Sequence, residues 1–359
     1  MDKLYKSYFK KIRGYEKEMT EKSYLLNNDD RKALKKVKFK TLFWSAIYGA
    51  LGVIFYFLPI HLYPEIFPKI NLNKWFSIDF VLEYGQIFYG VILMIIELHL
   101  LTILHLKAVN KMAVLTRFYD LSALENKEDF LFQLGMDAKE LGLNDYGIDP
   151  YQEVNKNLLM FFTFLIKLKG FFANKLMQYL IKRLMGRYAI RYVVDYVGVP
   201  VYMVINAYGT NIILKKTLIC IMGSNLINTY VSKLRLKNIN ESEKELIYDS
   251  LQLIAMSKRD YHQNHFILTQ KLFNYFEIKP KKKHIFTNVY YQKLSKSSKE
   301  IQQICQEILI LGFILDGNFS RNEEKKIKIL NDFGLIIQTS SQLKVLNKKF
   351  LNGEEFELL

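Results

Sequence analysis

The chain has 359 residues, half of them apolar, and a net charge of +16 that comes mostly from lysine. Such a charge could attract nucleic acid or anionic lipid, but zinc-finger spacings and aromatic RNA-binding signatures are absent, so we expect no nucleic-acid partner. The lysine excess could equally reflect a compositional bias of the source genome. Cys220 and Cys305 lie far apart in apolar runs, which excludes a cysteine metal quartet and indicates a reducing compartment.

The first part of the chain, residues 1–40, is predicted to be a charged helical arm. It ends in a basic cluster between Arg31 and Lys40. Lysines and an arginine interrupt every earlier apolar run, so we expect no cleavable signal peptide.

An uncharged run follows from Thr41 to Ile60. A helix needs about 20 such residues to cross the hydrocarbon core of a bilayer. Trp44 lies near one end of the run and Tyr56 near the other, as in the aromatic belts of membrane helices. The pattern therefore predicts a transmembrane helix, with a buried core helix as the alternative.

A second apolar run extends from about Phe80 to Leu106 and completes a predicted transmembrane helical hairpin over residues 41–106. This run is less uniform because it contains Glu97, His99 and His105. These side chains could serve a metal site or a proton relay, but we expect them to mark the place where the helix leaves the membrane. The basic cluster before the first run places both termini on the cytoplasmic side by the positive-inside rule.

Residues 107–155 are predicted to be a helical connector, and residues 156–235 an apolar and basic region associated with the membrane. In this region Lys175, Lys182 and Arg183 lie opposite an apolar helical stripe. They could meet anionic lipid headgroups at the membrane surface, or they could be the solvated face of a core helix. The uncharged stretch from Val197 to Leu214 contains Gly198, Pro200 and Gly209, which favours either a hairpin that dips into the membrane interface or a buried core.

The last part, residues 236–359, has the pattern of a soluble helical domain with a weak internal repeat. Residues 250–278 align with residues 308–336 at an offset of 58 positions. Each copy is predicted to form an apolar helix, a polar turn and a second apolar helix.

The turn of the second copy runs from Asp316 to Glu323. Ser320 can cap the next helix while Glu323, three residues later, accepts a hydrogen bond from the backbone of the cap. Asp316 and Glu323 are also candidate ligands of a divalent cation, because hard oxygen ligands gather at this turn.

The turn and its flanking helices, about residues 298–336, resemble the TerB-like helical domains of tellurite-resistance proteins, with a degenerate copy at 241–278. The resemblance implies metal binding by Asp316 and Glu323, although the first copy has Lys258 and His265 in place of acids. The segment from Gly186 to Asn206 is similar to the apolar signature of EcsC-like membrane-associated proteins. Together these resemblances imply an uncharacterised family of bacterial inner-membrane proteins.

No phosphate-binding loop, dinucleotide fingerprint, zinc-protease motif or nucleophile elbow is present, so no catalytic residue is predicted. We therefore expect an all-α, multi-pass membrane protein with cytoplasmic helical domains. The predicted function is that of a membrane-anchored scaffold or stress-response adaptor, which presents its helical domain to a protein partner or a divalent cation. A membrane-surface enzyme or transport component, and a membrane-inserting effector, are the alternatives.

Overall fold

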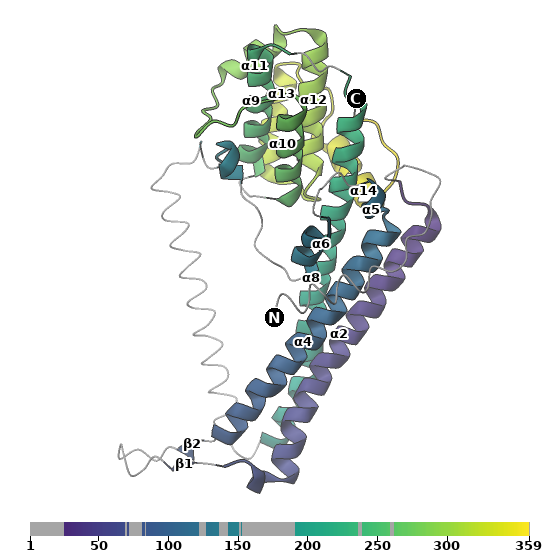
Figure 1. The fold of residues 1–359 in the computed structure, drawn as a ribbon, viewed down its shortest axis with the longest axis vertical. Helices are drawn as coiled ribbons and strands as arrows, with labels where there is room; N and C mark the ends of the chain where they lie inside the picture. The colour runs from purple at the N-terminus through teal and green to yellow at the C-terminus, as the bar shows by residue number, and fades with distance from the viewer. Residues whose placement is uncertain are drawn as a thin grey trace. The chain divides into compact units, whose positions relative to one another are not determined.

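The fold of the chain is seen in a computed structural model. It describes residues 25–68, 70–71, 81–82, 84–121, 127–135, 143–150, 152, 191–235, 239–258 and 262–358. The predicted all-α class is confirmed: apart from two strands of two residues each, every element of the described part is helical (Figure 1). These strands, β1 (Ile70–Asn71) and β2 (Val81–Leu82), pair antiparallel with Ile70 opposite Leu82.

The chain divides into two compact units. The described residues of the first unit are 36–68, 70–71, 81–82, 84–109 and 191–214. The second unit contains residues 25–35, 110–121, 127–135, 143–150, 152, 215–235, 239–258 and 262–358. Three helices contribute part of their length to each unit: α2 (Asn28–Leu62), α4 (Tyr84–Leu115) and α8 (Arg191–Lys233).

Two of these helices, α2 and α4, are long and apolar enough to span a membrane. Helix α2 begins at Asn28, so the basic end of the predicted arm forms its first turns instead of a separate segment. Helix α4 continues to Leu115, past the boundary expected at residue 106. In both places lysines extend a helix whose apolar stretch lies next to them, because lysine has a good helix propensity.

The uncharged stretch from Val197 to Leu214 is neither a dipping hairpin nor a buried core. It lies within the single helix α8, which continues through Gly198, Pro200 and Gly209. A proline inside a helix removes one backbone hydrogen bond, and membrane helices tolerate this loss when neighbouring helices pack against them.

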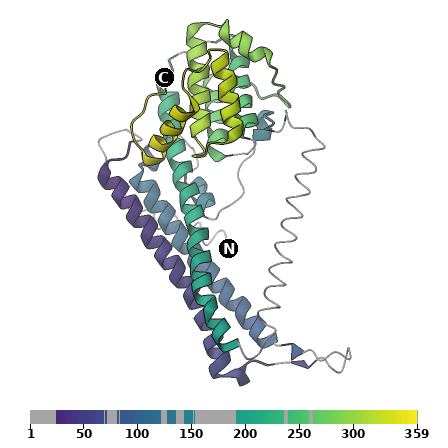
Figure 2. The ribbon, with the colours of Figure 1, turned by 180° about the vertical axis from the view of Figure 1, so that it is seen from behind.

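In the first unit, α2, α4 and α8 lie side by side, as views from opposite sides show (Figures 1 and 2). Small residues of α2 permit the close approach of the other two helices. A Cβ atom on Gly49 would lie 2.6 Å from the carbonyl oxygen of Tyr202 in α8. A Cβ atom on Gly52 would lie 2.9 Å from Oε2 of Glu97 in α4. A larger residue at Gly49 would therefore push α2 and α8 apart, whereas at Gly52 it would displace the Glu97 side chain.

The second unit has two helical hairpins at its centre. The first consists of α9 (Glu241–Lys258) and α10 (Gln263–Tyr275), and the second of α12 (Lys299–Ile314) and α13 (Arg321–Asp332). The other helices of this unit are α5 (Phe118–Leu121), α6 (Lys127–Gly135), α11 (Val289–Ser295), α14 (Ser340–Asn352) and the 3-10 helix η2 (Leu143–Tyr146). A further 3-10 helix, η1 (Pro64–Ile66), belongs to the first unit.

The predicted repeat has a counterpart in reciprocal contacts between the two hairpins. The side-chain amide of Asn322 donates to the carbonyl of Ser257 at 2.7 Å, at the end of α9. Its counterpart in the first copy, Asn264, donates to the carbonyl of Leu315 at 2.6 Å, just after α12. Each asparagine thus satisfies a terminal helix carbonyl of the other hairpin, which would otherwise lack a partner.

Candidate functional site

The two residues predicted to bind a metal, Asp316 and Glu323, meet around a lysine side chain. The Nζ atom of Lys258 lies 2.6 Å from Oδ1 of Asp316 and 2.5 Å from Oε1 of Glu323. Only 3% of the Lys258 side chain and 1% of the Glu323 side chain are exposed. Both charges are therefore removed from water, and each depends on the other for compensation.

Backbone oxygens complete the environment of the Lys258 ammonium group. The group donates to the carbonyls of Phe313, at 2.9 Å, and Asn318, at 3.1 Å. Four oxygen atoms from the end of α12, the turn and the start of α13 therefore converge on a single cation. Calcium sites use the same donor types, carboxylates and backbone carbonyls.

The geometry of the turn matches the predicted helix cap. The Ser320 side chain accepts from the backbone of Glu323, and the Glu323 carboxylate accepts from the backbone of Ser320 at 2.6 Å. The capping box predicted from the sequence is therefore confirmed. Glu323 thus binds its own helix end and the Lys258 ammonium at the same time.

Lys258 occupies the position of the first copy that corresponds to Asp316 in the second, 58 residues later. Where the second copy provides an acid, the first provides an intramolecular cation. Within the described residues, no group of three or more histidine, cysteine, aspartate or glutamate side chains could hold a metal ion. Divalent-cation binding by Asp316 and Glu323 stays a prediction, and any such ion would compete with the Lys258 ammonium for the same oxygens.

The environment shifts the proton affinity of two groups in this cluster. Burial raises the pKa of Glu323, and the nearby Lys258 ammonium opposes this shift. Burial lowers the pKa of His265 from 6.5 to about 4, with Lys258 acting in the same direction and Asp316 against it. The Nε2 atom of His265 lies 2.9 Å from the carbonyl oxygen of Gly312. A neutral imidazole that donates from Nε2 fits this contact.

A second set of polar contacts joins the three helices of the first unit. The Oγ1 atom of Thr210 lies 2.6 Å from Oγ of Ser45 and 2.9 Å from Nε2 of His105, and all three residues are buried. One turn earlier on α8, the amide of Asn206 donates to Glu97 at 2.5 Å. Glu97 and His105 therefore both contact α8, whereas the sequence led us to expect them only at the membrane boundary.

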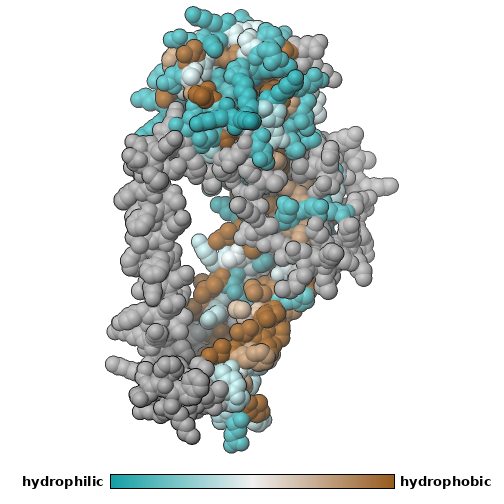
Figure 3. Space-filling model, turned by 60° about the vertical axis from the view of Figure 1, so that its left-hand side comes forward, coloured by the Kyte–Doolittle hydropathy of each residue, from teal (hydrophilic) through white to brown (hydrophobic). Residues whose placement is uncertain are grey.

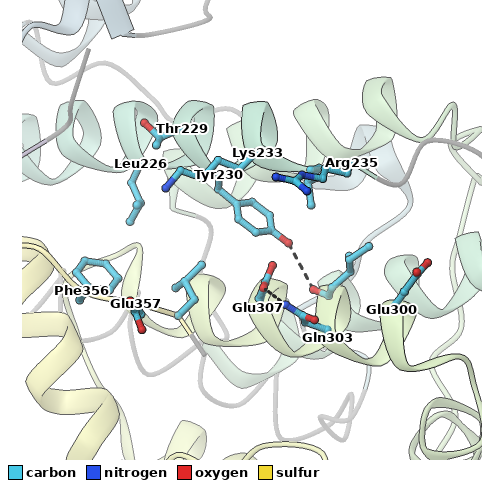
Figure 4. A pocket seen from close by; sticks show the side chains of 13 residues that line it. Leu226, Thr229, Tyr230, Lys233, Arg235, Glu300, Gln303, Glu307, Phe356 and Glu357 are labelled. Carbon is cyan, nitrogen blue, oxygen red and sulfur yellow. Dashed lines mark hydrogen bonds between the residues drawn. The ribbon is translucent and has the colours of Figure 1, made fainter. Parts of the chain in front are cut away.

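The second unit also contains a pocket of about 720 Å³ (Figure 4). One side carries Lys233 and Arg235 from the end of α8 and the residues after it, and the other carries Glu300 and Glu307 from α12. Tyr230 points toward α12, where its hydroxyl lies 3.5 Å from the Ile304 carbonyl (Figure 4). The remaining lining residues are Leu226, Thr229, Leu234, Gln303, Ile304, Phe356, Glu357 and Leu358.

The residues that join α2 and α8 carry no distinctive sequence motif. Asn206 and Thr210 are four residues apart, and so are Ser45 and Gly49, which places each pair on one helix face. That spacing could have indicated the contact between α2 and α8. The predicted membrane-surface residues Lys175, Lys182 and Arg183 lie outside the described residues.

Replacing Lys258 by methionine should leave the Asp316 and Glu323 carboxylates facing each other without a cation. We expect the variant to lose about 3–5 kcal/mol of stability in the second unit, the usual cost of breaking a buried pair. The control is Lys344→Met, which removes the half-exposed pair of Lys344 with Glu324 and should cost at most about 1 kcal/mol. Hydrogen exchange of α12 and α13 in the full chain measures both losses. Equal losses would contradict the proposed role of the buried pair.

The same Lys258→Met variant tests the predicted divalent site. With the ammonium removed, the four oxygens are open to another cation, so added Ca²⁺ should slow hydrogen exchange in α13 of the variant. The wild-type chain is the control, because Lys258 already occupies the oxygens. If Ca²⁺ has no effect on the variant, the predicted divalent site is wrong.

His265 should make the second unit less stable in acid. Its folded pKa lies below its unfolded value, so its stabilisation is complete above pH 6.5 and is lost as the pH falls toward about 4. The loss is on the order of 3 kcal/mol. The raised pKa of Glu323 makes the second unit more stable as the pH falls, which opposes the effect of His265. The effect of His265 is therefore measured as the difference between the wild-type chain and a variant at each pH.

The variant His265→Gln keeps a donor for the Gly312 carbonyl and cannot titrate. Its stability should therefore fall less than that of the wild-type chain over this pH range. Hydrogen exchange of α10 and α12, compared between the two proteins at each pH, checks this. The control His262→Asn keeps a capping side chain at the start of α10. An unchanged pH dependence in His265→Gln would exclude His265 as the cause.

The chain was also compared with known proteins. No family model, no curated protein and no solved structure matches it. The TerB-like and EcsC-like resemblances therefore stay predictions. The functional interpretation depends on three features of the described residues: the buried Lys258 cluster, the polar contacts between α2, α4 and α8, and the charged pocket.

Proposed function

We propose that this chain is a membrane-anchored adaptor, held in the bilayer by α2 and α4, whose second unit binds a segment of a partner protein. One observation is the main support for the membrane anchor. In the most apolar 18-residue stretch of α4, no residue is buried. A core helix of a soluble protein would have most of such a stretch covered by other parts of the protein, so lipid is the favoured environment.

The exposed side chains of α4 and α2 support this proposal. On α4 they include Phe88, Ile95 and Leu98, which are 68%, 53% and 56% exposed. On α2, Phe55 and Leu58 are exposed as well. In the space-filling view, hydrophobic side chains gather over the helices of the first unit (Figure 3). Leaving so many large apolar side chains in water would be costly.

The distribution of charge supports a hairpin with both termini on the cytoplasmic side. Helices α2 and α4 run antiparallel, since Gly52 contacts Glu97 while Tyr56, further along α2, contacts Gly90. The lysines before the apolar part of α2 and those after the apolar part of α4, Lys107 and Lys111, therefore lie at the same end. By the positive-inside rule this end faces the cytoplasm. The predicted family would place the protein in a bacterial inner membrane.

The pocket of the second unit is the proposed partner site. Its walls carry opposite charges, and Leu226, Ile304 and Phe356 give it an apolar part. This combination suits a peptide segment with an apolar side chain between an acidic and a basic residue. A scaffold of this kind needs no catalytic group of its own.

Alkaline carbonate extraction of membranes tests the anchor. We expect the wild-type chain to stay in the membrane pellet, because carbonate releases peripheral proteins but not helices that span lipid. The variant Ile92→Lys, Ile95→Lys, Ile96→Lys should be released to a greater extent than the wild-type chain, since each lysine at the centre of a membrane helix costs about 3 kcal/mol and leaves α2 without its partner helix. The control carries three lysines at exposed apolar positions of the second unit, Ile285, Val289 and Ile337, and should stay in the pellet. Release of the wild-type chain would contradict the proposed anchor.

A photo-crosslinking amino acid at Gln303, an exposed residue of the pocket, tests the partner site. In cells it should crosslink one defined protein, and the double variant Lys233→Glu, Arg235→Glu should abolish the product by reversing the charge of one wall. The control Lys279→Glu, Lys282→Glu makes the same charge change at exposed positions outside the pocket and should keep the product. Loss of the product in both variants would show a general charge effect and would sink the pocket as the binding site.

A further inference from the structure

We propose that the part of α8 between Gly198 and Leu214 is a third lipid-spanning helix, which packs on α2 and α4 and presents its outer face to the hydrocarbon chains of the bilayer. The proposal rests on the membrane anchor proposed above. It assigns lipid as the partner of the exposed face of α8, a helix that is not part of the anchor formed by α2 and α4.

The inner face of this part of α8 contains small and polar groups that are matched by groups of α2 and α4. Thr210 contacts Ser45 and His105, and Asn206 donates to Glu97. The carbonyl of Tyr202 approaches the backbone of α2 at Gly49, where any side chain would collide with it. Small residues and interhelical hydrogen bonds are the usual basis of helix packing in membranes, where apolar side chains gain little by leaving lipid.

The outer face is apolar and uncovered. Five of its exposed large side chains share one face of the helix: Val201, Val204, Ile205, Tyr208 and Ile212. Val204 and Tyr208 are 67% and 66% exposed. This stripe continues the exposed apolar side chains of α2 and α4 in the same unit, so a single occupant that covers all three helices explains it best. A bilayer is such an occupant.

The length of the uncharged stretch fits this occupant. No charged residue occurs from Val197 to Leu214, and Asp195 and Lys215 lie just beyond its two ends. A helix of this length extends about 27 Å at 1.5 Å per residue, close to the roughly 30 Å of the hydrocarbon core. The flanking charges can therefore reach the headgroups at both surfaces.

The direction of α8 has a consequence for the topology. Ser45 of α2 contacts Thr210 of α8, and Val53, which comes later in α2, contacts Gly198, which comes earlier in α8. These two helices are therefore antiparallel. Along α4, Glu97 contacts Asn206 and His105 contacts Thr210, so α4 and α8 are parallel. Because α8 runs parallel to α4, its carboxyl end lies at the same surface as the carboxyl end of α4, which is the cytoplasmic one.

Spin labels on single cysteines of the full chain, in lipid vesicles, test the lipid contact. Cys220 and Cys305 are first replaced by alanine. Oxygen concentrates in lipid and a water-soluble nickel chelate in water, so relaxation by the two reagents reports the environment of each label. We expect Val204→Cys and Tyr208→Cys to be more accessible to oxygen than to nickel, as Ile95→Cys on α4 should be. Ile337→Cys, 85% exposed in the second unit, should show the reverse.

Each outcome separates the two proposals. If Ile95→Cys reads as lipid-exposed and Val204→Cys as water-exposed, the third span is wrong and the anchor stands. If both read as water-exposed, the anchor itself is wrong. If Val204→Cys is inaccessible to both reagents, protein and not lipid covers the stripe, and the proposal is overturned.

A maleimide that cannot cross membranes tests the direction of α8. The test uses sealed vesicles whose non-cytoplasmic surface faces the reagent. Two cysteine variants should be labelled in them: Ile66→Cys, next to the end of α2, and Arg191→Cys, at the first residue of α8. A cysteine at Lys344 in the second unit should be labelled only after the vesicles are opened. Labelling of Arg191→Cys only after opening would refute the parallel crossing of α4 and α8.

Discussion

The second unit depends most on the ion pairs that the buried ammonium group of Lys258 forms with Asp316 and Glu323. This group lies at the end of α9 in the first helical hairpin, and its oxygen partners lie in and next to the turn between α12 and α13. Removing a charged group from water costs several kcal/mol, so the arrangement is stable only because carboxylates and carbonyls surround the charge. The pair therefore fixes how the two hairpins pack. Asn264 and Asn322 add reciprocal caps to the same contact.

The cluster also changes how the acidic turn is understood. In sequence, Asp316 and Glu323 are two acids near a helix start, a pattern that fits a metal site as well as a helix cap. In space, their charges are balanced by a lysine from the other copy of the repeat. A covalently attached cation needs no ion concentration to stay bound, so the two hairpins can associate without a metal. The two copies of the repeat are therefore joined by an intramolecular ion pair. A bound ion in the same place would make stability depend on the concentration of that ion.

The first unit follows a different principle. Its outward side chains are large and apolar, and in the proposed lipid environment contact between its helices depends on small residues and hydrogen bonds instead of hydrophobic burial. Ser45, Gly49 and Gly52 give α2 a face on which α4 and α8 can approach closely. Asn206 and Thr210 of α8 then partner Glu97 and His105, which would otherwise be polar groups in an apolar environment. The proposed third span follows from this division between a polar inner face and an apolar outer face.

The sequence by itself determined the elements whose signal is local. The uncharged run from Thr41 to Ile60 predicted a membrane-length helix, and the spacing of Ser320 and Glu323 predicted the capping box, because both depend on neighbours within a few residues. Only the tertiary structure decided which groups meet across the chain. The repeat aligned Lys258 with Asp316, 58 positions later, but did not indicate that the two side chains meet, and no pattern linked Glu97 with Asn206, 109 positions later. The continuity of α8 through Pro200 was decided in the same way, since packing against α2 and α4 compensates a helix break that the local sequence favours.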